Sequence, residues 1–69
     1  DVSAAELMQL IQSLPAGFRT VFNLFAIEGY SHKEIGERLN ITESTSRSQY
    51  TRAKQLLQRK VNALYGEKR

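Results

Sequence analysis

The sequence contains no cysteine and a single proline among its 69 residues. Without cysteine there can be no disulfide, and no obvious ligand cluster suggests a structural zinc, so stability must come from helix packing. No apolar run approaches the roughly 20 residues of a membrane span, and no charged segment precedes an apolar one as in a secretory signal. These absences predict a soluble protein of the cytoplasm that does not contact a membrane.

The length of the chain allows one small domain, which buries roughly 60% of the surface that its unfolded form exposes. The sequence starts at Asp1 rather than at Met, and it ends in Gly66-Glu67-Lys68-Arg69. We therefore expect a single domain over residues 1–69 that is excised from a longer chain.

Positive charge is concentrated in the second half of the chain. Residues 1–30 hold one Arg against three acidic residues, a net charge of −2. Residues 31–69 hold nine Lys and Arg against four Glu, a net charge of +5. Clustered positive charge of this kind is typical of a nucleic-acid-binding surface, although a solvated basic face would give the same count.

Two helices are predicted before residue 30. Ser3 and Glu6 form a Ser-x-x-Glu capping box. An apolar face at helical spacing follows it, made of Leu7, Leu10, Ile11 and Leu14. Pro15 separates this helix from the next, which should extend to a C-capping Gly29. The second helix carries an aromatic stripe that we expect at the centre of the core, made of Phe18, Val21, Phe22 and Phe25 and widened by Leu24 and Ile27.

A helix-turn-helix is predicted from Ser31 onward. Ser31 and Glu34 form a second capping box, so a helix should begin at His32 and run for about two turns. Asn40 tolerates the left-handed conformation that ends a helix, and Thr42 is a fresh N-cap. No residue breaks the helical pattern again before Gly66. The fold class is therefore all-α, a four-helix domain with a C-terminal helix-turn-helix.

The two helices of this motif should pack closely. Ile35 and Leu39 give the first of them a buried pair, and Gly36 lies between them where the close approach of a neighbouring helix would favour a residue without a side chain. The buried face of the last helix has steps of three or four residues and comprises Ser46, Tyr50, Ala53, Leu57, Val61 and Leu64. We expect the Ser46 hydroxyl to contribute little beyond a local backbone bond, so that Ser46→Val would add stability if the space beside Gly36 and Ile35 takes the extra methyl group. If the backbone has closed around Ser46, overpacking would instead lower stability.

The opposite face of the last helix is polar and supplies the candidate DNA contacts. At 100° per residue it comprises Ser44, Ser48, Thr51, Arg52 and Gln55, with Arg47 and Gln49 on its flanks. Arg pairs bidentately with guanine and Gln with adenine, whereas short hydroxyl side chains let a helix sit deep in the major groove. The free N–H groups after Thr42 suit a phosphate, and His32 and Lys33 should cross the DNA backbone.

Enzymatic activity is not expected. The chain has one His, no Cys and no close pair of carboxylates, so that neither an acid-base nor a metal-binding constellation can be assembled. We predict no catalytic residue, no metal and no cofactor.

Three segments of the sequence resemble a known family. They are residues 14–22 (LPAGFRTVF), 28–36 (EGYSHKEIG) and 45–53 (TSRSQYTRA). Together they are similar to the C-terminal domain, region four, of bacterial extracytoplasmic-function (ECF) sigma factors, over about residues 3 to 60. Two positions depart from the family pattern: Ser46 stands where many relatives carry Val, and Gln49 replaces a commoner basic residue.

The resemblance implies a specific function. Such a domain reads the minus-thirty-five element of promoter DNA and contacts the β flap of RNA polymerase, and its sigma factor is held by an anti-sigma factor. We expect a monomer, because the last helix continues with Gln58, Arg59 and Lys60 beside Val61 and Leu64, a composition that permits a weak dimer without indicating one. The resemblance also implies that four positions meet DNA, namely Arg47, Ser48, Thr51 and Arg52.

Two other interpretations stay open at this point. The output domain of a two-component or quorum-sensing (LuxR-type) regulator has a similar helical arrangement and also binds DNA. A helical protein-interaction module would instead dock through the apolar end of the last helix. The dependence of affinity on salt concentration distinguishes the interaction module from the two DNA-binding interpretations. DNA binding through Lys and Arg weakens steeply as the salt concentration rises, whereas docking through an apolar surface hardly changes.

Overall fold

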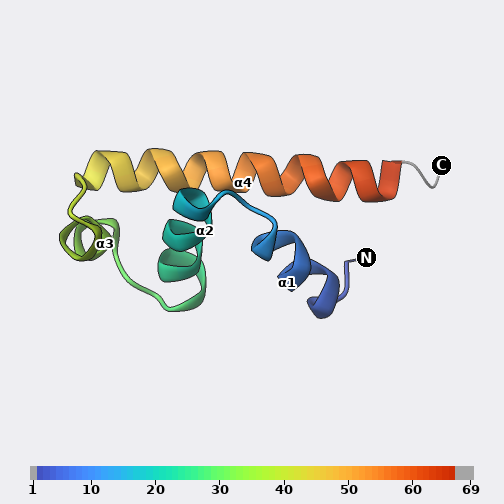
Figure 1. The fold of residues 1–69 in the computed structure, drawn as a ribbon, viewed down its shortest axis with the longest axis horizontal. Coiled ribbons are helices and arrows are strands. Elements are labelled where there is room, and N and C mark those ends of the chain that lie inside the picture. Colours follow the sequence, from blue (N-terminus) through green and yellow to red (C-terminus); the bar gives the residue numbers. More distant parts are fainter. Residues whose placement is uncertain (1, 67–69) are drawn as a thin grey trace.

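The computed structural model describes residues 2–66, and these form helices with no strand. The elements follow in the order α1 (Ala4–Gln12), α2 (Ala16–Phe22), the π-helical turn η1 (Asn23–Ile27), α3 (His32–Leu39) and α4 (Glu43–Gly66). The long α4 runs the length of the molecule, and α1, α2 and α3 all lie along one side of it (Figure 1). The predicted all-α fold with four helices is confirmed.

Both predicted capping boxes are present. Ser3 Oγ accepts from the Glu6 N–H at 3.1 Å, and the Glu6 carboxylate accepts from the Ser3 N–H at 3.2 Å. At the start of α3 the same exchange joins Ser31 and Glu34, with distances of 3.1 and 2.9 Å. Each box satisfies backbone donors that the first turn of a helix leaves free, so the two helix starts are encoded locally.

The second predicted helix differs from the expectation in its last turn. Residues 23–27 form a π turn rather than a continuation of the α-helix, with the Glu28 N–H donating to the Asn23 carbonyl at 3.0 Å. Gly29 then adopts the predicted left-handed conformation, with φ 81°. The π turn carries Phe25, whose ring stacks on His32 of α3. That contact joins separate elements, and helical periodicity carries no signal for it.

The core centres on residues contributed by α1, the α1–α2 junction and α4. Ile11, Leu14, Ala53 and Leu57 form its buried cluster, and Phe18 and Phe22 pack against the edge of the cluster while only partly buried. The expectation that the aromatic stripe forms the centre was therefore wrong, except for Val21, which is 1% exposed. Bulky rings at the margin cover a core whose middle is made of smaller side chains. On α1, the predicted apolar residue Leu7 is exposed.

The turn between α3 and α4 closes against Gly36. Asn40 ends α3 in the left-handed conformation with φ 57°, and the Ile41 N–H donates to the Gly36 carbonyl at 2.9 Å. A Cβ atom on Gly36 would lie 2.7 Å from the Ile41 carbonyl oxygen and 3.3 Å from the Glu43 nitrogen. The close approach at Gly36 is confirmed, but its partner is the backbone of the turn that leads into α4 and not the neighbouring helix that was predicted.

No helix among residues 2–66 combines the length and the apolar composition that a membrane-spanning segment needs.

We predict that Gly36→Ala lowers the free energy of unfolding by about 1 to 3 kcal/mol, because the new methyl group meets backbone atoms that cannot rotate away. Gly17→Ala is the matched control, since a Cβ there has no atom within 4 Å. That control should gain about 0.5 to 1 kcal/mol from helix propensity. Urea unfolding of both variants tests the prediction, and a Gly36→Ala variant as stable as the parent would contradict it.

Candidate nucleic-acid interface

The side of α4 that faces away from the other helices carries a shallow polar hollow of about 510 Å³. All the residues that line it are exposed, and all were predicted as DNA contacts from the helical projection: Ser44, Arg47, Ser48, Thr51, Arg52 and Gln55. The buried side of the same helix holds Ser46, Ala53 and Leu57. The predicted division of α4 into a buried and an exposed face is confirmed.

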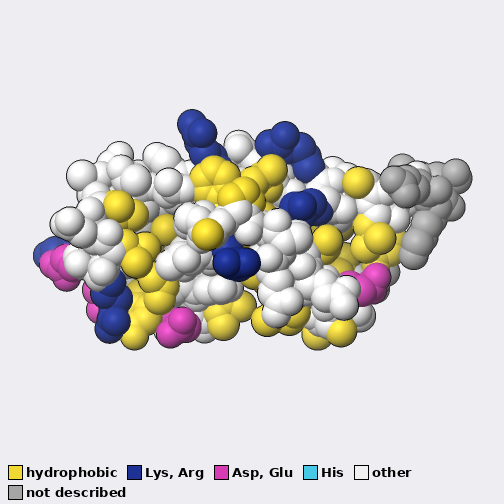
Figure 2. Space-filling view, viewed as in Figure 1, with side chains coloured by type: hydrophobic (Ala, Val, Ile, Leu, Met, Phe, Trp, Pro, Cys, Tyr) yellow, Lys and Arg dark blue, Asp and Glu magenta, His cyan; other side chains and the backbone are white. Residues whose placement is uncertain are grey.

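Positive charge follows the same helix. Figure 2 shows Lys and Arg side chains along the outer edge of α4, and no acidic side chain is visible on that edge in this view. Arg47 is paired with Glu43 one turn earlier, and their side chains are 57% and 45% exposed. An ion pair this exposed contributes little stability, so the Arg47 guanidinium can exchange its partner for a nucleic acid at small cost.

The start of α4 is capped by Thr42, as predicted. Its Oγ1 accepts from the Thr45 N–H at 3.0 Å, and its hydroxyl donates to Thr45 Oγ1 at 2.8 Å. This cap satisfies one of the free N–H groups of the first turn. The N–H groups of Glu43 and Ser44 have no acceptor within the helix, so this exposed end remains electropositive.

His32 has a packing role that the sequence analysis did not predict. Its ring stacks on Phe25 with a centroid distance of 4.1 Å and an interplanar angle of 6°, and it lies tilted against Tyr50 at 5.7 Å. Its Nδ1 shares a hydrogen bond of 2.9 Å with Ser46 Oγ. Phe25 and Tyr50 also contact each other, with a centroid distance of 4.6 Å, so His32 belongs to a cluster of three rings. These contacts leave Nε2 without a partner among the described residues, and the expectation that His32 crosses the DNA backbone stays a prediction.

The electrostatic surroundings of His32 favour the neutral ring. Partial burial lowers its pKa from the usual 6.5, and the nearby charge of Arg47 acts in the same direction. Glu43 opposes these effects and Lys54 adds to them. Neutral imidazole has one donor and one acceptor nitrogen, so it can exchange a hydrogen bond with the Ser46 hydroxyl in either tautomer.

The Ser46 hydroxyl therefore does more than the sequence analysis expected. Ser46 is fully buried, and its bond to His32 joins the first turn of α4 to the first turn of α3. The expected gain in stability from Ser46→Val assumed that the Ser46 hydroxyl has no partner in another helix. This assumption was wrong, because His32 of α3 is its partner. Sequence alone offered one signal for the pair, namely a polar residue on a buried helix face with one His at the start of the preceding helix.

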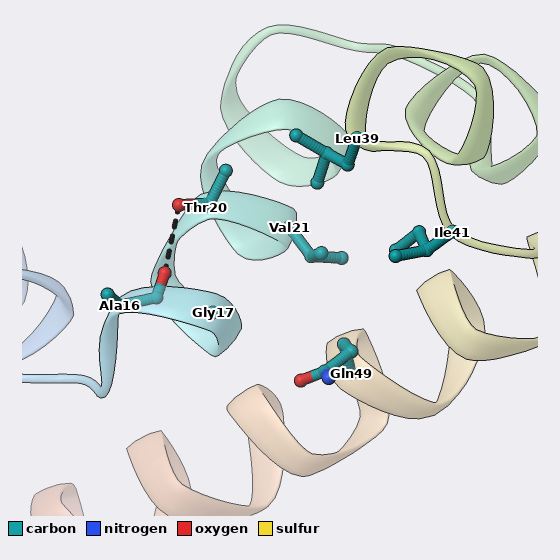
Figure 3. A pocket seen from close by; sticks show the side chains of 7 residues that line it. All are labelled: Ala16, Gly17, Thr20, Val21, Leu39, Ile41 and Gln49. Atoms are coloured by element: carbon teal, nitrogen blue, oxygen red, sulfur yellow. Dashed lines mark hydrogen bonds between the residues drawn. The ribbon is translucent and has the colours of Figure 1, made fainter.

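Gln49 also lies elsewhere than predicted. It leaves α4 toward α2 and lines an apolar hollow of about 370 Å³ (Figure 3), together with Ala16, Gly17, Thr20, Val21, Leu39 and Ile41. Its Oε1 is buried without a hydrogen-bond partner among the described residues. The prediction of Gln49 as a DNA contact is corrected, because a residue on the flank of a helical projection can turn either way and this one turns inward.

Two cations are held over aromatic rings. The Lys54 Nζ lies 4.7 Å from the centre of the Tyr50 ring, and the Arg38 guanidinium lies 4.1 Å from the centre of the Tyr30 ring. Such contacts contribute about 0.5 to 1 kcal/mol at exposed sites.

Lys33, the remaining predicted contact outside α4, is exposed at the start of α3.

We predict that Ser46→Val lowers the free energy of unfolding by about 1 to 3 kcal/mol, since it leaves a partly buried His32 nitrogen without its partner. Ser48→Val is the matched control on the exposed face of the same helix and should change stability by less than about 0.5 kcal/mol. Thermal and urea unfolding measure both. A Ser46→Val domain more stable than the parent would show that the bond to His32 contributes nothing.

The described residues contain no group of three or more His, Cys, Asp and Glu side chains that could hold a metal ion.

Comparison with curated proteins and with solved structures gives no significant match. The family model described as sigma-70, region 4, matches residues 4–57, which include α1, α2, α3 and the exposed polar hollow of α4. The chain therefore belongs to the sigma-70 region 4 family, the non-catalytic DNA-binding domains through which sigma factors contact promoters and RNA polymerase in transcription initiation.

Proposed function

We propose that this domain recognises the minus-thirty-five element as the C-terminal domain of an ECF sigma factor. Family membership supports promoter binding, and the three sequence segments that resemble ECF proteins support the subclass. The observation that carries the proposal is the polar hollow on α4, where six predicted contact residues meet on one exposed face. A helix that exposes such a face beside a capped three-residue turn can enter the major groove.

The residues of the hollow divide by chemistry. Arg47 and Arg52 can each pair with the O6 and N7 atoms of a guanine, and Gln55 can pair with an adenine. Ser48 and Thr51 are short enough to let α4 approach the base edges, and their hydroxyl groups can bond bases or phosphates. These five residues carry the proposed sequence recognition.

Phosphate contacts fix the position of the domain on the duplex. The electropositive start of α4 offers the N–H groups next to Thr42, and Ser44 lies in the same first turn. Lys33 stands at the exposed start of α3, which crosses the backbone in this docking geometry. His32 supports this arrangement from inside the domain through its bond to Ser46.

The proposed partners follow from the same family resemblance. They are double-stranded promoter DNA, the β flap of the RNA polymerase core and an anti-sigma factor, and the domain acts as a monomer within a longer cytoplasmic protein. The match to sigma-70 region 4 favours this function over the regulator output domain. A protein-interaction module without DNA binding predicts affinity that hardly changes with salt, whereas the proposed contacts predict a steep loss.

We predict that Arg52→Ala weakens binding to the cognate element by about 1 to 3 kcal/mol while the domain melts normally, because Arg52 is exposed and lines the hollow. Gln49→Ala is the control on the same helix and should leave DNA affinity unchanged, since Gln49 faces α2. Fluorescence anisotropy at one fixed salt concentration measures both. If the loss followed Gln49 and spared Arg52, the assigned DNA face would be wrong.

The experiment that tests the proposed function is sequencing of the DNA retained by the intact sigma factor together with RNA polymerase. An enriched pair of promoter motifs, with an upstream motif that disappears when Arg47 and Arg52 are replaced by Ala, is the expected result. Enrichment of one palindromic site without dependence on polymerase would instead favour a regulator. Absence of any enriched sequence would contradict both DNA-binding interpretations.

A further inference from the structure

A second hollow continues the first along α4. It has a volume of about 310 Å³ and is lined by Phe18, Arg52, Gln55, Leu56 and Arg59. Arg52 and Gln55 line both hollows, so the two form one trough that runs from the first turn of α4 to Arg59. Arg59 lies just beyond the family match, which ends at residue 57, and outside the set of predicted DNA contacts.

The arginines of the described part of the chain fall into two groups. Arg19 donates to the Gln12 carbonyl at 2.9 Å, Arg47 pairs with Glu43, and Arg38 lies over Tyr30. Arg52 and Arg59 have no such partner within residues 2–66. The two arginine side chains without such a partner among these residues are thus the two that line the second hollow, where all five N–H donors of each stay available.

The composition of the hollow suits one class of ligand. Free guanidinium groups bind phosphate through charge-assisted hydrogen bonds, often with two parallel N–H donors. Phe18 and Leu56 supply an apolar wall between them, against which a deoxyribose ring can pack. A sugar-phosphate backbone offers both chemistries at once, whereas a base edge would require a matched set of polar donors and acceptors.

The length of α4 places this hollow at the edge of a groove. Arg59 follows Arg52 by seven residues, which is about 10 Å along a helix and nearly the same angular position. It follows Arg47 by about 18 Å, whereas the major groove is about 12 Å wide. If the first hollow lies over base edges, the second therefore meets the strand that borders the groove.

We propose that the hollow between Phe18 and Arg59 binds the sugar-phosphate backbone of duplex DNA that flanks the recognised element, with Arg59 as the phosphate contact. This inference rests on the proposed function, since it needs the first part of α4 in the groove. It extends the DNA interface from Arg52 by about two helical turns, to a residue just beyond the matched segment, and assigns α2 a part in it through Phe18. The contact is independent of base sequence, so it adds affinity and no selectivity.

The test compares Arg59→Gln with Lys60→Gln, which removes the same charge at the next position, where the side chain lines neither hollow. Affinity is measured for a random-sequence duplex and for the duplex enriched from a random library by the parent chain. Arg59→Gln should lower both affinities by the same factor, roughly threefold to tenfold, and should reduce the slope of log affinity against log salt by about 0.9. Lys60→Gln should have less than about a twofold effect on both.

Equal effects of the two variants would overturn the inference, and so would a loss confined to the enriched duplex, which would mean base recognition. A loss of affinity for core polymerase with DNA binding unchanged would make the hollow a protein-docking surface and would also overturn it. The same measurements separate a failure of the proposed function from a failure of the backbone contact. If the parent chain binds DNA without sequence preference and Arg59→Gln still weakens that binding, promoter recognition is rejected and the backbone contact is retained. Thermal melts confirm that each variant is folded.

Discussion

The backbone of α3 can touch the turn before α4 because residue 36 has no side chain. A Cβ at Gly36 would lie 2.7 Å from the Ile41 carbonyl oxygen, so any larger residue would open the turn. This contact fixes where α4 begins and how it leaves α3. The bond between His32 and the buried Ser46 is a second tie across the same junction, one turn into α4. Together they orient the exposed polar face of α4.

The helix α4 serves the core and the proposed interface through two different faces. Its inward side begins with two small, fully buried residues, Ser46 and Ala53, and with Tyr50 between them, whose ring packs on Phe22 and Phe25. Its outward side carries the first hollow, whose six lining residues are all exposed. Substitutions of the exposed polar residues of the trough should therefore change binding with little effect on folding. Substitutions on the inward side should change both, because displacement of α4 moves every contact residue together.

Local signals predicted most of this structure. The capping boxes, the left-handed Asn40 and the Thr42 cap depend on neighbours within a few residues, and helical periodicity separated the buried from the exposed side of α4. The features that were not predicted depend on contacts between distant parts of the chain and not on local signals. The stacking of Phe25 on His32 and the inward turn of Gln49 depend on elements that are distant in the sequence. No single-residue propensity encodes the orientation of a ring, or the choice that a side chain on a helix flank makes between two neighbours.

The central claim is that the exposed face of α4 meets DNA while its buried face holds the domain together. Amide-resolved NMR of the domain, titrated with the duplex that it enriches from a random library, tests this most directly. The account predicts the largest shift changes between Ser44 and Gln55, with signals of α1 nearly unmoved. Changes centred on α1, or on the apolar hollow beneath Gln49, would contradict it, because DNA would then bind a side of the domain opposite to the proposed interface.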